Sequence, residues 1–136
     1  DAEKAGTILH GTEAVLATTE SQVPWTTIMI RKSFGVAAAA HYGPDGYVLA
    51  WPSAESGPLP LEGGVAVAFK KEIAAAKDPE AKRKELEEKM AKNQNPFPRA
   101  EAFSVHEIID PRETRKYIAM WAERIQSQLR ASLVMK

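Results

Sequence analysis

The spacing of apolar and polar residues in the first third of the chain predicts two helices and two strands. Apolar residues recur every three or four positions, as in a helix, and we expect one over residues 2–20. It ends before Pro24, because the residue before a proline avoids the helical region. A β-branched, apolar run predicts a buried strand at residues 25–31. A tight turn at 33–35, a short helix at 36–41, a Gly-Pro-Asp-Gly turn at 43–46 and a strand at 47–51 follow.

The remaining residues predict mostly helices. Residues 52–64 are rich in Pro, Gly and Ser, and we expect a loop there, with a helix beginning near Gly64. Asp78 and Pro79 are typical of the cap and first position of a helix over residues 80–93, whose many Lys and Glu residues indicate a solvent-facing surface. A helical turn at 99–103 and a strand at 105–109 follow. Asp110 to Glu113 form a capping box that starts a final helix with one apolar stripe.

This alternation of helices and strands predicts an α/β domain. The strands are few and short, so we expect a neighbouring domain to complete the core. No internal repeat is visible in the sequence. Ten apolar residues at periodic positions are expected to form the core: Val15, Leu16, Ile28, Ile30, Leu49, Phe69, Ile73, Ile109, Ile118 and Trp121.

Charge and composition exclude several classes of function. The 136 residues suit one domain, and 18 basic residues balance 18 acidic ones, which argues against a nucleic-acid surface. No cysteine is present, so disulfides and thiolate chemistry are excluded. No apolar run approaches the ~20 residues of a membrane span, and we expect a cytoplasmic protein without membrane contact. The first residue is not Met, which indicates a piece of a longer or processed chain.

A glycine turn followed by small residues is the main candidate for chemistry. Gly35 follows a predicted strand and precedes a helix that begins with Val36 and four alanines. The first N–H groups of such a helix have no partner within it and suit a developing negative charge, as in an oxyanion hole. Ordinary packing of a glycine turn against an alanine helix explains the same pattern. The segment from Leu61 to Gly64 is a second glycine turn that a ligand could approach, or simply a helix start.

No catalytic constellation of side chains accompanies these turns. His10, His41 and His106 lie far apart, without metal-like spacing, and each is more typical of a packing or surface residue. Glu55 lies in a predicted loop, where a solvated carboxylate is the simpler interpretation. No Ser/His/Asp order, P-loop or dinucleotide-binding glycine pattern is present.

Five segments, in order, resemble a known family over nearly the whole chain. They are AGTILHG at residues 5–11, RKSFGVA at 31–37, AWPSAE at 50–55, GGVAVAFKKEI at 63–73, and the closing pair formed by NPF at 95–97 and IDPRETR at 109–115. Together they resemble the C-terminal carboxyltransferase domain of the β subunits of biotin-dependent acyl-CoA carboxylases, of the acetyl- and propionyl-CoA carboxylase type.

The resemblance implies a crotonase-like fold of ββα units stacked in a spiral. Residues 1–136 would be a C-terminal carboxyltransferase domain from a longer, two-domain chain. It would supply the biotin side of a site that moves a carboxyl group from carboxybiotin, held on a carrier protein, to the α-carbon of an acyl-CoA. The implied partners are an N-terminal carboxyltransferase domain, further copies in a homo-oligomer, and biotin carboxylase and biotin carrier subunits. Alone, the chain would be inactive.

The resemblance also implies site residues. Gly35, Val36 and Ala37 would provide backbone donors to an oxyanion, and no side-chain base would be required. Residues expected to contact biotin are Phe34, Ala38, Glu62, Gly63 and Gly64.

Two residues depart from the family pattern. Val36 and Pro60 stand where glycine is usual, and Ala39 occupies a position tied to acyl-chain choice. Two alternatives remain open: a biotin-dependent acyl-CoA decarboxylase subunit, and a non-catalytic assembly module with the same fold. The departures at Val36 and Pro60 slightly favour the module.

Overall fold

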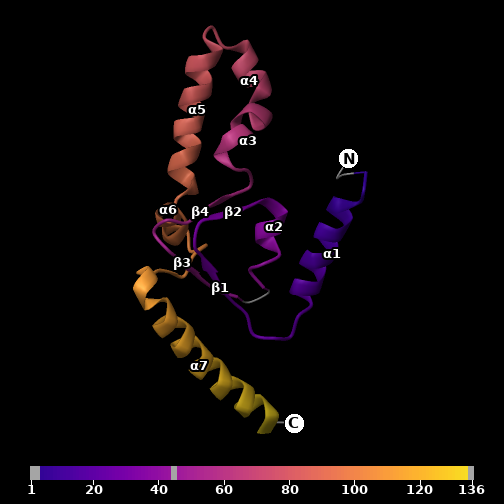
Figure 1. Ribbon diagram of the computed structural model, residues 1–136, viewed down its shortest axis with the longest axis vertical. Coiled ribbons are helices and arrows are strands. Elements are labelled where there is room, and N and C mark those ends of the chain that lie inside the picture. The colour runs from indigo at the N-terminus through magenta and orange to yellow at the C-terminus, as the bar shows by residue number, and fades with distance from the viewer. Residues whose placement is uncertain (1–3, 44–45, 135–136) are drawn as a thin grey trace.

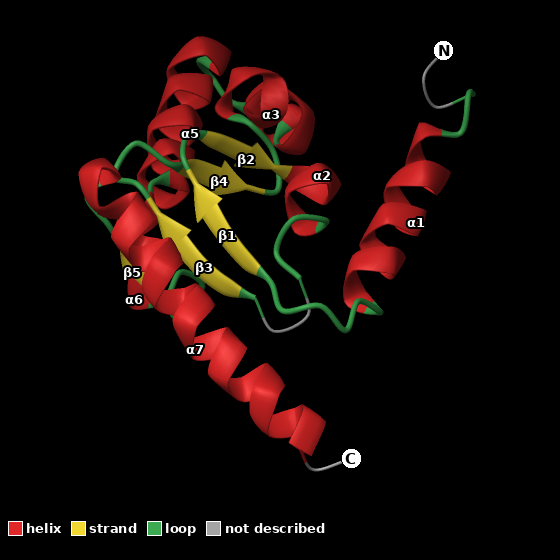
Figure 2. Cartoon of the chain, turned by 60° about the horizontal axis from the view of Figure 1, so that its bottom comes forward, coloured by secondary structure: helices red, strands yellow, loops and turns green. Residues whose placement is uncertain are grey.

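Two strand–strand–helix units follow one another in the chain and stack in parallel. The computed structural model describes residues 4–43 and 46–134, with Glu62 and residues 132–134 described by their backbone alone. The first strands of the two units pair in one sheet, and the second strands pair in another (Figure 2). The first unit comprises β1 (Thr26–Met29), β2 (Lys32–Phe34) and α2 (Gly35–Ala39); the second comprises β3 (Tyr47–Ala50), β4 (Glu55–Gly57) and α3 (Leu61–Ala68). This arrangement agrees with the expected α/β class and stacked ββα units.

The two units repeat in backbone geometry, although the sequence shows no repeat. Thr26 pairs with Tyr47 in the first sheet, and Lys32 pairs with Glu55 in the second. The corners between the strands also stack, because the Glu55 N–H donates to the Arg31 carbonyl at 2.8 Å. The Ser53 hydroxyl donates to the Ile30 carbonyl at the same distance. Backbone pairing of this kind needs no side-chain similarity, which explains why the repeat is absent from the sequence.

The helices extend the molecule beyond its two small sheets. A helical hairpin formed by α3 with α4 against α5 projects from one end, while α7 leads away from the other, and α1 lies beside α2 (Figure 1). A short strand, β5, adds to the free edge of β3. The bounds of these elements are α1 (Thr7–Thr19), α4 (Lys70–Ala75), α5 (Pro79–Gln94), α6 (Pro96–Glu101), β5 (Glu107–Ile108), the 3-10 turn Pro111–Glu113 and α7 (Thr114–Val134).

Two predicted N-terminal caps are confirmed, one at the start of α5 and one at the 3-10 turn that leads into α7. The Asp78 carboxylate accepts from the N–H groups of Glu80 at 3.1 Å and Ala81 at 3.0 Å. The Asp110 carboxylate accepts from the Arg112 N–H at 2.8 Å and also pairs with its guanidinium. In each case an aspartate satisfies N–H groups that the first helical turn leaves without partners.

Several predicted boundaries are wrong. Residues 33–35 are not a tight turn: Ser33 and Phe34 belong to β2, and Gly35 opens α2. The predicted loop at 52–64 contains β4 and the first turns of α3, and the predicted strand at 105–109 reduces to Glu107–Ile108. β2 and β4 are each three residues long and exist because they pair with one another, which local sequence does not reveal. Pro44 and Asp45 of the predicted turn at 43–46 lie outside the described residues.

The core lies around β1, β3 and the segment before β5. It is formed by Met29, Val48, Ala50, Ala54 and Val105. Of the ten residues predicted for the core, Leu49 and Ile109 are fully buried, and five are partly buried: Val15, Ile28, Phe69, Ile73 and Trp121.

Three core predictions are wrong, since Leu16, Ile30 and Ile118 are 56, 50 and 40% exposed. Leu16 and Ile118 belong to α1 and α7, which stand off the sheets so that only part of each helix is covered (Figure 2). Ile30 lies at the corner between β1 and β2.

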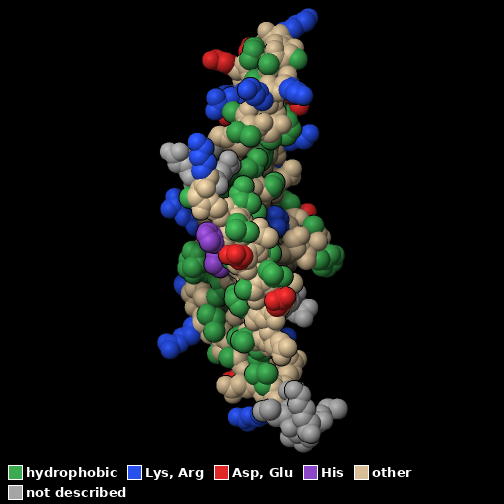
Figure 3. All heavy atoms as spheres, turned by 90° about the vertical axis from the view of Figure 1, so that its right-hand side faces the viewer, with side chains coloured by type: hydrophobic (Ala, Val, Ile, Leu, Met, Phe, Trp, Pro, Cys, Tyr) green, Lys and Arg blue, Asp and Glu red, His purple; other side chains and the backbone are tan. Residues whose placement is uncertain are grey.

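Hydrophobic side chains reach the surface along much of the face shown in Figure 3. Within the described residues, the helices are all too short or too polar to cross a lipid bilayer.

Candidate functional site

The chain reverses direction between β2 and α2 at a left-handed glycine. Gly35 has φ +67°, a conformation that residues with a Cβ seldom adopt, and Phe34 before it is extended. A Cβ added to Gly35 would lie 3.5 Å from the carbonyl oxygen of Pro58. That is an ordinary contact distance, so the left-handed backbone at the entry into α2, rather than crowding, is what favours glycine here.

The first turn of α2 presents uncapped backbone N–H groups. No side chain caps this end of the helix, and the N–H groups of a first helical turn have no partner within the helix. Val36 is 60% exposed and Ala37 is exposed as well. Ala38, by contrast, is buried. Small residues around such donors let an acceptor oxygen approach the backbone.

Helix α1 supports α2 from one side. A Cβ added to Gly11 of α1 would lie 3.7 Å from Cγ1 of Val36. Further along, the Thr18 hydroxyl donates to the Ala40 carbonyl at 3.0 Å, at the C-terminal end of α2. The Val36 side chain is thus in contact range of α1.

The second glycine segment, residues 61–64, follows β4, the strand that pairs with β2. Phe34 at the end of β2 pairs with Gly57 at the end of β4, so the two strand-to-helix junctions leave the same edge of the small sheet. Pro60 caps α3 with extended backbone, and Gly63 within α3 has φ +84°. Gly64 is buried, and a Cβ added there would come within 3.0 Å of the Leu59 Cβ. The side chain of Glu62 lies outside the described residues.

This arrangement offers fixed backbone donors, while the side chain of Glu62, in the first turn of α3, lies outside the described residues. His10, His41 and Glu55, the titratable residues singled out in the first half of the chain, are all exposed. No group of three or more His, Cys, Asp or Glu residues within the described part of the chain could hold a metal ion. The chemistry that fits here is stabilisation of an oxyanion by backbone N–H groups. Such donors fit the carbonyl oxygen of a planar ureido ring equally well.

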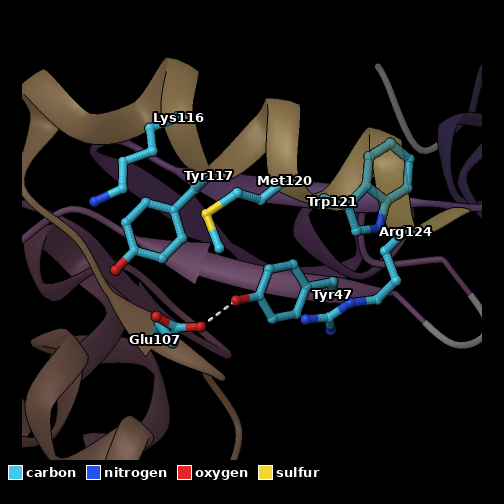
Figure 4. A pocket seen from close by; sticks show the side chains of 7 residues that line it. All are labelled: Tyr47, Glu107, Lys116, Tyr117, Met120, Trp121 and Arg124. Atoms are coloured by element: carbon cyan, nitrogen blue, oxygen red, sulfur yellow. Dashed lines mark hydrogen bonds between the residues drawn. The ribbon is translucent and has the colours of Figure 1, made fainter.

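A hollow of about 180 Å³ lies between α7 and the edge of the larger sheet. Figure 4 shows Tyr47 and Tyr117 on either side of the Glu107 carboxylate, with Arg124 beside Tyr47. The Tyr47 hydroxyl donates to Glu107 Oε1. Burial, followed by the hydrogen bond and charge of Glu107, raises the pKa of Tyr47 to about 12. A phenol with this pKa stays protonated near neutrality and is a poor general base.

Sequence reasoning missed this hollow, because Tyr47, Glu107 and Tyr117 come from three separate elements without a shared motif.

Comparisons with known proteins identify what the chain resembles. The model of the carboxyl transferase domain family matches residues 1–136. The methylmalonyl-CoA carboxyltransferase 12S subunit of Propionibacterium freudenreichii subsp. shermanii is 38% identical over 134 residues, which cover 93% of this chain and 26% of that protein. The methylmalonyl-CoA decarboxylase subunit alpha of Propionigenium modestum is 37% identical over 121 residues, which cover 85% of this chain and 23% of that protein.

A crystal structure of the transcarboxylase 12S hexamer, with methylmalonyl-coenzyme A and methylmalonic acid bound, superposes with a TM-score of 0.79 at 38% identity. The match covers 92% of this chain and 25% of the solved one. This agreement establishes the crotonase-like carboxyltransferase fold expected from the sequence. The chain spans about a quarter of the length of the relatives it matches.

Proposed function

Because this chain belongs to the carboxyl transferase domain family, we propose that it takes part in moving a carboxyl group from carboxybiotin to the α-carbon of an acyl-CoA. The observation that carries the proposal is the start of α2, where residues 31–37, one of the segments that resemble the family, end in uncapped backbone donors. The relative with 38% identity is a methylmalonyl-CoA carboxyltransferase subunit, which supports an acyl-CoA as the substrate class.

The N–H groups of Val36 and Ala37 are the proposed oxyanion donors, with Gly35 setting their direction. Fixed donors favour a transition state because they need not reorganise as negative charge develops. Carboxybiotin supplies the activated carboxyl group when it is bound. Of the residues proposed to contact it, Phe34 lies at the end of β2 and Gly63 within α3, while Ala38 and Gly64 are buried and would shape the backbone rather than meet ligand through a side chain.

This chain is proposed to supply only the biotin side of the active site. The relatives are about four times longer than the matched region, and an N-terminal carboxyltransferase domain would hold the acyl-CoA. The solved 12S relative is a hexamer, which supports a homo-oligomer. Sites formed between its subunits are part of the proposal. Biotin carboxylase and biotin carrier subunits are the further partners proposed.

Decarboxylation is a second candidate, favoured by one observation. The methylmalonyl-CoA decarboxylase subunit alpha is almost as similar as the carboxyltransferase subunit, at 37% against 38% identity. Both reactions would use the same donors on an oxyanion, so the geometry of α2 does not separate them. The two reactions differ in the direction in which the carboxyl group moves, so an assay of that direction separates them.

The test is a transfer assay on the protein at its full natural length. Labelled carboxybiotin is supplied with short acyl-CoAs, and label is followed into the acyl-CoA; the reverse reaction is followed by loss of label from methylmalonyl-CoA to free biotin. The proposal expects label to reach the acyl-CoA only when biotin carries it. Residues 1–136 alone should be inactive, and turnover by that fragment at the rate of the full protein would contradict the half-site proposal. A folded, full-length protein that transfers no label in either direction would favour the non-catalytic module.

A further inference from the structure

Helix α1 has little cover within the chain. All 13 of its residues are described and none is fully buried, and Ile8, Leu9 and Leu16 are each more than half exposed. The helix lies against α2, on the face shown in Figure 3, where hydrophobic side chains reach the surface. A helix of this length is marginal in water by itself, because most of the stability of a helix comes from packing of its apolar face. We therefore expect another surface to cover α1.

Helix α7 is also covered over only part of its surface. Ile118 and Met120 are exposed, and so are residues 126–131 further along. The Trp51 indole N–H donates to Thr114 Oγ1 at 2.9 Å, which fixes the point where the helix leaves the larger sheet. In the views of Figure 1 and Figure 2, α1 and α7 lie on different sides of the sheets, so among the described residues the two helices do not cover each other.

The exposed apolar face of α1 is acidic. Glu13 follows Leu9 by four positions and precedes Leu16 by three, so these three side chains share one face of the helix. The Glu13 carboxylate pairs with His10 Nδ1 at 3.0 Å, and both side chains are largely exposed. The helix contains neither lysine nor arginine. A surface that covers this face is therefore favoured by a positive charge opposite Glu13.

Helix α7 carries the complementary charge. Arg115 precedes Ile118 by three positions and lies on the same face of the helix. Arg115, Arg124 and Arg130 have no carboxylate in ion-pair range among the described residues. Within Thr114–Val134 the sequence contains a single acidic residue, Glu123. These arginines are thus available to a partner, and complementary charges of this kind select a partner and fix its register.

We propose that α1 of one copy of this chain packs against α7 of a second copy, with Glu13 opposite Arg115. The contact would cover the exposed Leu9, Leu16 and Ile118 together with the opposite charges beside them. Each copy presents one helix of each kind, so the contact joins two different surfaces and can link copies into a closed ring. The inference rests on the homo-oligomer of the proposed function, whose contact surfaces it names, and it does not depend on carboxyl transfer.

The contact is tested by exchanging its two charges in the full-length protein and measuring self-association by sedimentation velocity. Glu13→Arg and Arg115→Glu each place like charges opposite one another, so each variant alone should associate at least about tenfold more weakly than the parent. An equimolar mixture of the two variants should recover the parent association, because the exchanged charges are complementary between unlike copies. Recovery by mixing requires a contact between copies. The matched controls Glu88→Arg and Lys84→Glu make the same changes at exposed positions of α5 and should associate as the parent does.

A disulfide cross-link keeps the test decisive if a charge variant does not fold. Ile118→Cys protein is mixed with Leu9→Cys or with Leu16→Cys protein, all otherwise free of cysteine, and oxidised. Leu9 and Leu16 lie one turn before and one turn after Glu13, so one of the two mixtures should form cross-linked pairs whichever way the helices run.

Three results would overturn the proposal. Unchanged association of both folded charge variants, or self-association with no cross-link in either mixture, would show that another part of the longer protein or another partner covers the two helices. Each of these results would leave the homo-oligomer standing. A full-length parent protein that stays monomeric would overturn the homo-oligomer as well, while carboxyl transfer is decided separately by the labelled-carboxybiotin assay.

Discussion

The imidazole of His106 takes the place of a backbone carbonyl beside Val48. The Val48 N–H donates to His106 Nδ1 at 3.1 Å, while the His106 N–H donates to the Val48 carbonyl at 2.9 Å. Together the two bonds continue the pairing of β3 with the segment entering β5. The ring also lies against Tyr47, with centroids 5.3 Å apart. His106 is thus a structural residue, as its lack of a metal-like spacing to the other histidines suggested.

Replacing this histidine should destabilise the protein. His106→Ala leaves the N–H of Val48, a residue only 6% exposed, without its acceptor, and we expect a loss of about 1–3 kcal/mol in the free energy of unfolding. Urea denaturation measures the change. His10→Ala is the matched control, because the His10 side chain is 72% exposed and its partner among the described residues is the exposed Glu13; it should shift stability by less than about 0.5 kcal/mol. Equal effects of the two substitutions would contradict the structural role of His106.

A strained residue ends α6. Phe103 has φ +57°, its N–H donates to the Ala100 carbonyl at 3.0 Å, and the Ser104 N–H donates to the Arg99 carbonyl at 2.8 Å. This is the Schellman motif, whose left-handed position normally belongs to glycine. Phe103→Gly should therefore stabilise the protein by about 1 kcal/mol, seen as a higher melting temperature, because the ring is 92% exposed and little packing is lost. Phe103→Ala keeps the strain and should change stability far less; a similar gain from alanine would refute this explanation.

Two glycines in helices should respond in opposite ways to alanine. A Cβ at Gly11 would lie at an ordinary contact distance, 3.7 Å, from Val36, so Gly11→Ala should stabilise by about 0.5–1 kcal/mol through helix propensity. At buried Gly64 the nearest atom would be the Leu59 Cβ at 3.0 Å, and Gly64→Ala should destabilise by about 1 kcal/mol through overcrowding. The melting temperatures of the two variants measure both changes in stability. A gain at both positions would show that Leu59 moves aside freely.

The backbone donors of α2 can be tested by removing one of them. Ala37→Pro deletes one N–H in the first helical turn, where proline is tolerated, so the fold should persist. We expect carboxyl transfer by the full-length protein to fall by about 100- to 1000-fold, since that is the usual cost of one oxyanion donor. Ala37→Ser keeps the donor and should be mild. A folded Ala37→Pro protein with the parent rate would remove Ala37 from the proposed site.

Ionisation of Tyr47 should make stability depend on pH in the alkaline range. Burial and then Glu107 raise its pKa from 10.0 to about 12 in the folded protein. Below pH 10 the phenol is protonated in both states, and its contribution to stability is complete. As pH rises from 10 to about 12, the unfolded chain loses this proton while the folded protein retains it, so stability falls. Comparison of denaturation across this range with Tyr47→Phe, which lacks the proton, should show a steeper loss in the parent; parallel curves would contradict the raised pKa.

The sequence by itself was enough to predict the helix caps, the longer helices and the family. Asp78 and Asp110 cap their helices as predicted, because capping depends on residues only two or three positions apart. Five segments in order pointed to the family that the comparisons identify, because each of them is a contiguous run of residues that can be read without the structure. Periodicity likewise found the longer helices.

Only the tertiary structure decided what depends on distant partners. Ser33 and Phe34 form a strand because Ser56 and Gly57 lie beside them, and nothing within residues 33–35 encodes that neighbour. Leu16 and Ile118 occupy apolar periodic positions yet are exposed, because periodicity identifies a face of a helix but not whether another element covers it. The hollow lined by Tyr47, Glu107 and Tyr117 arises in the same way, from β3, β5 and α7 meeting in space. Strand pairing, the covering of a helix face and the formation of a cavity all depend on residues far apart in the sequence. A local sequence pattern therefore does not predict them.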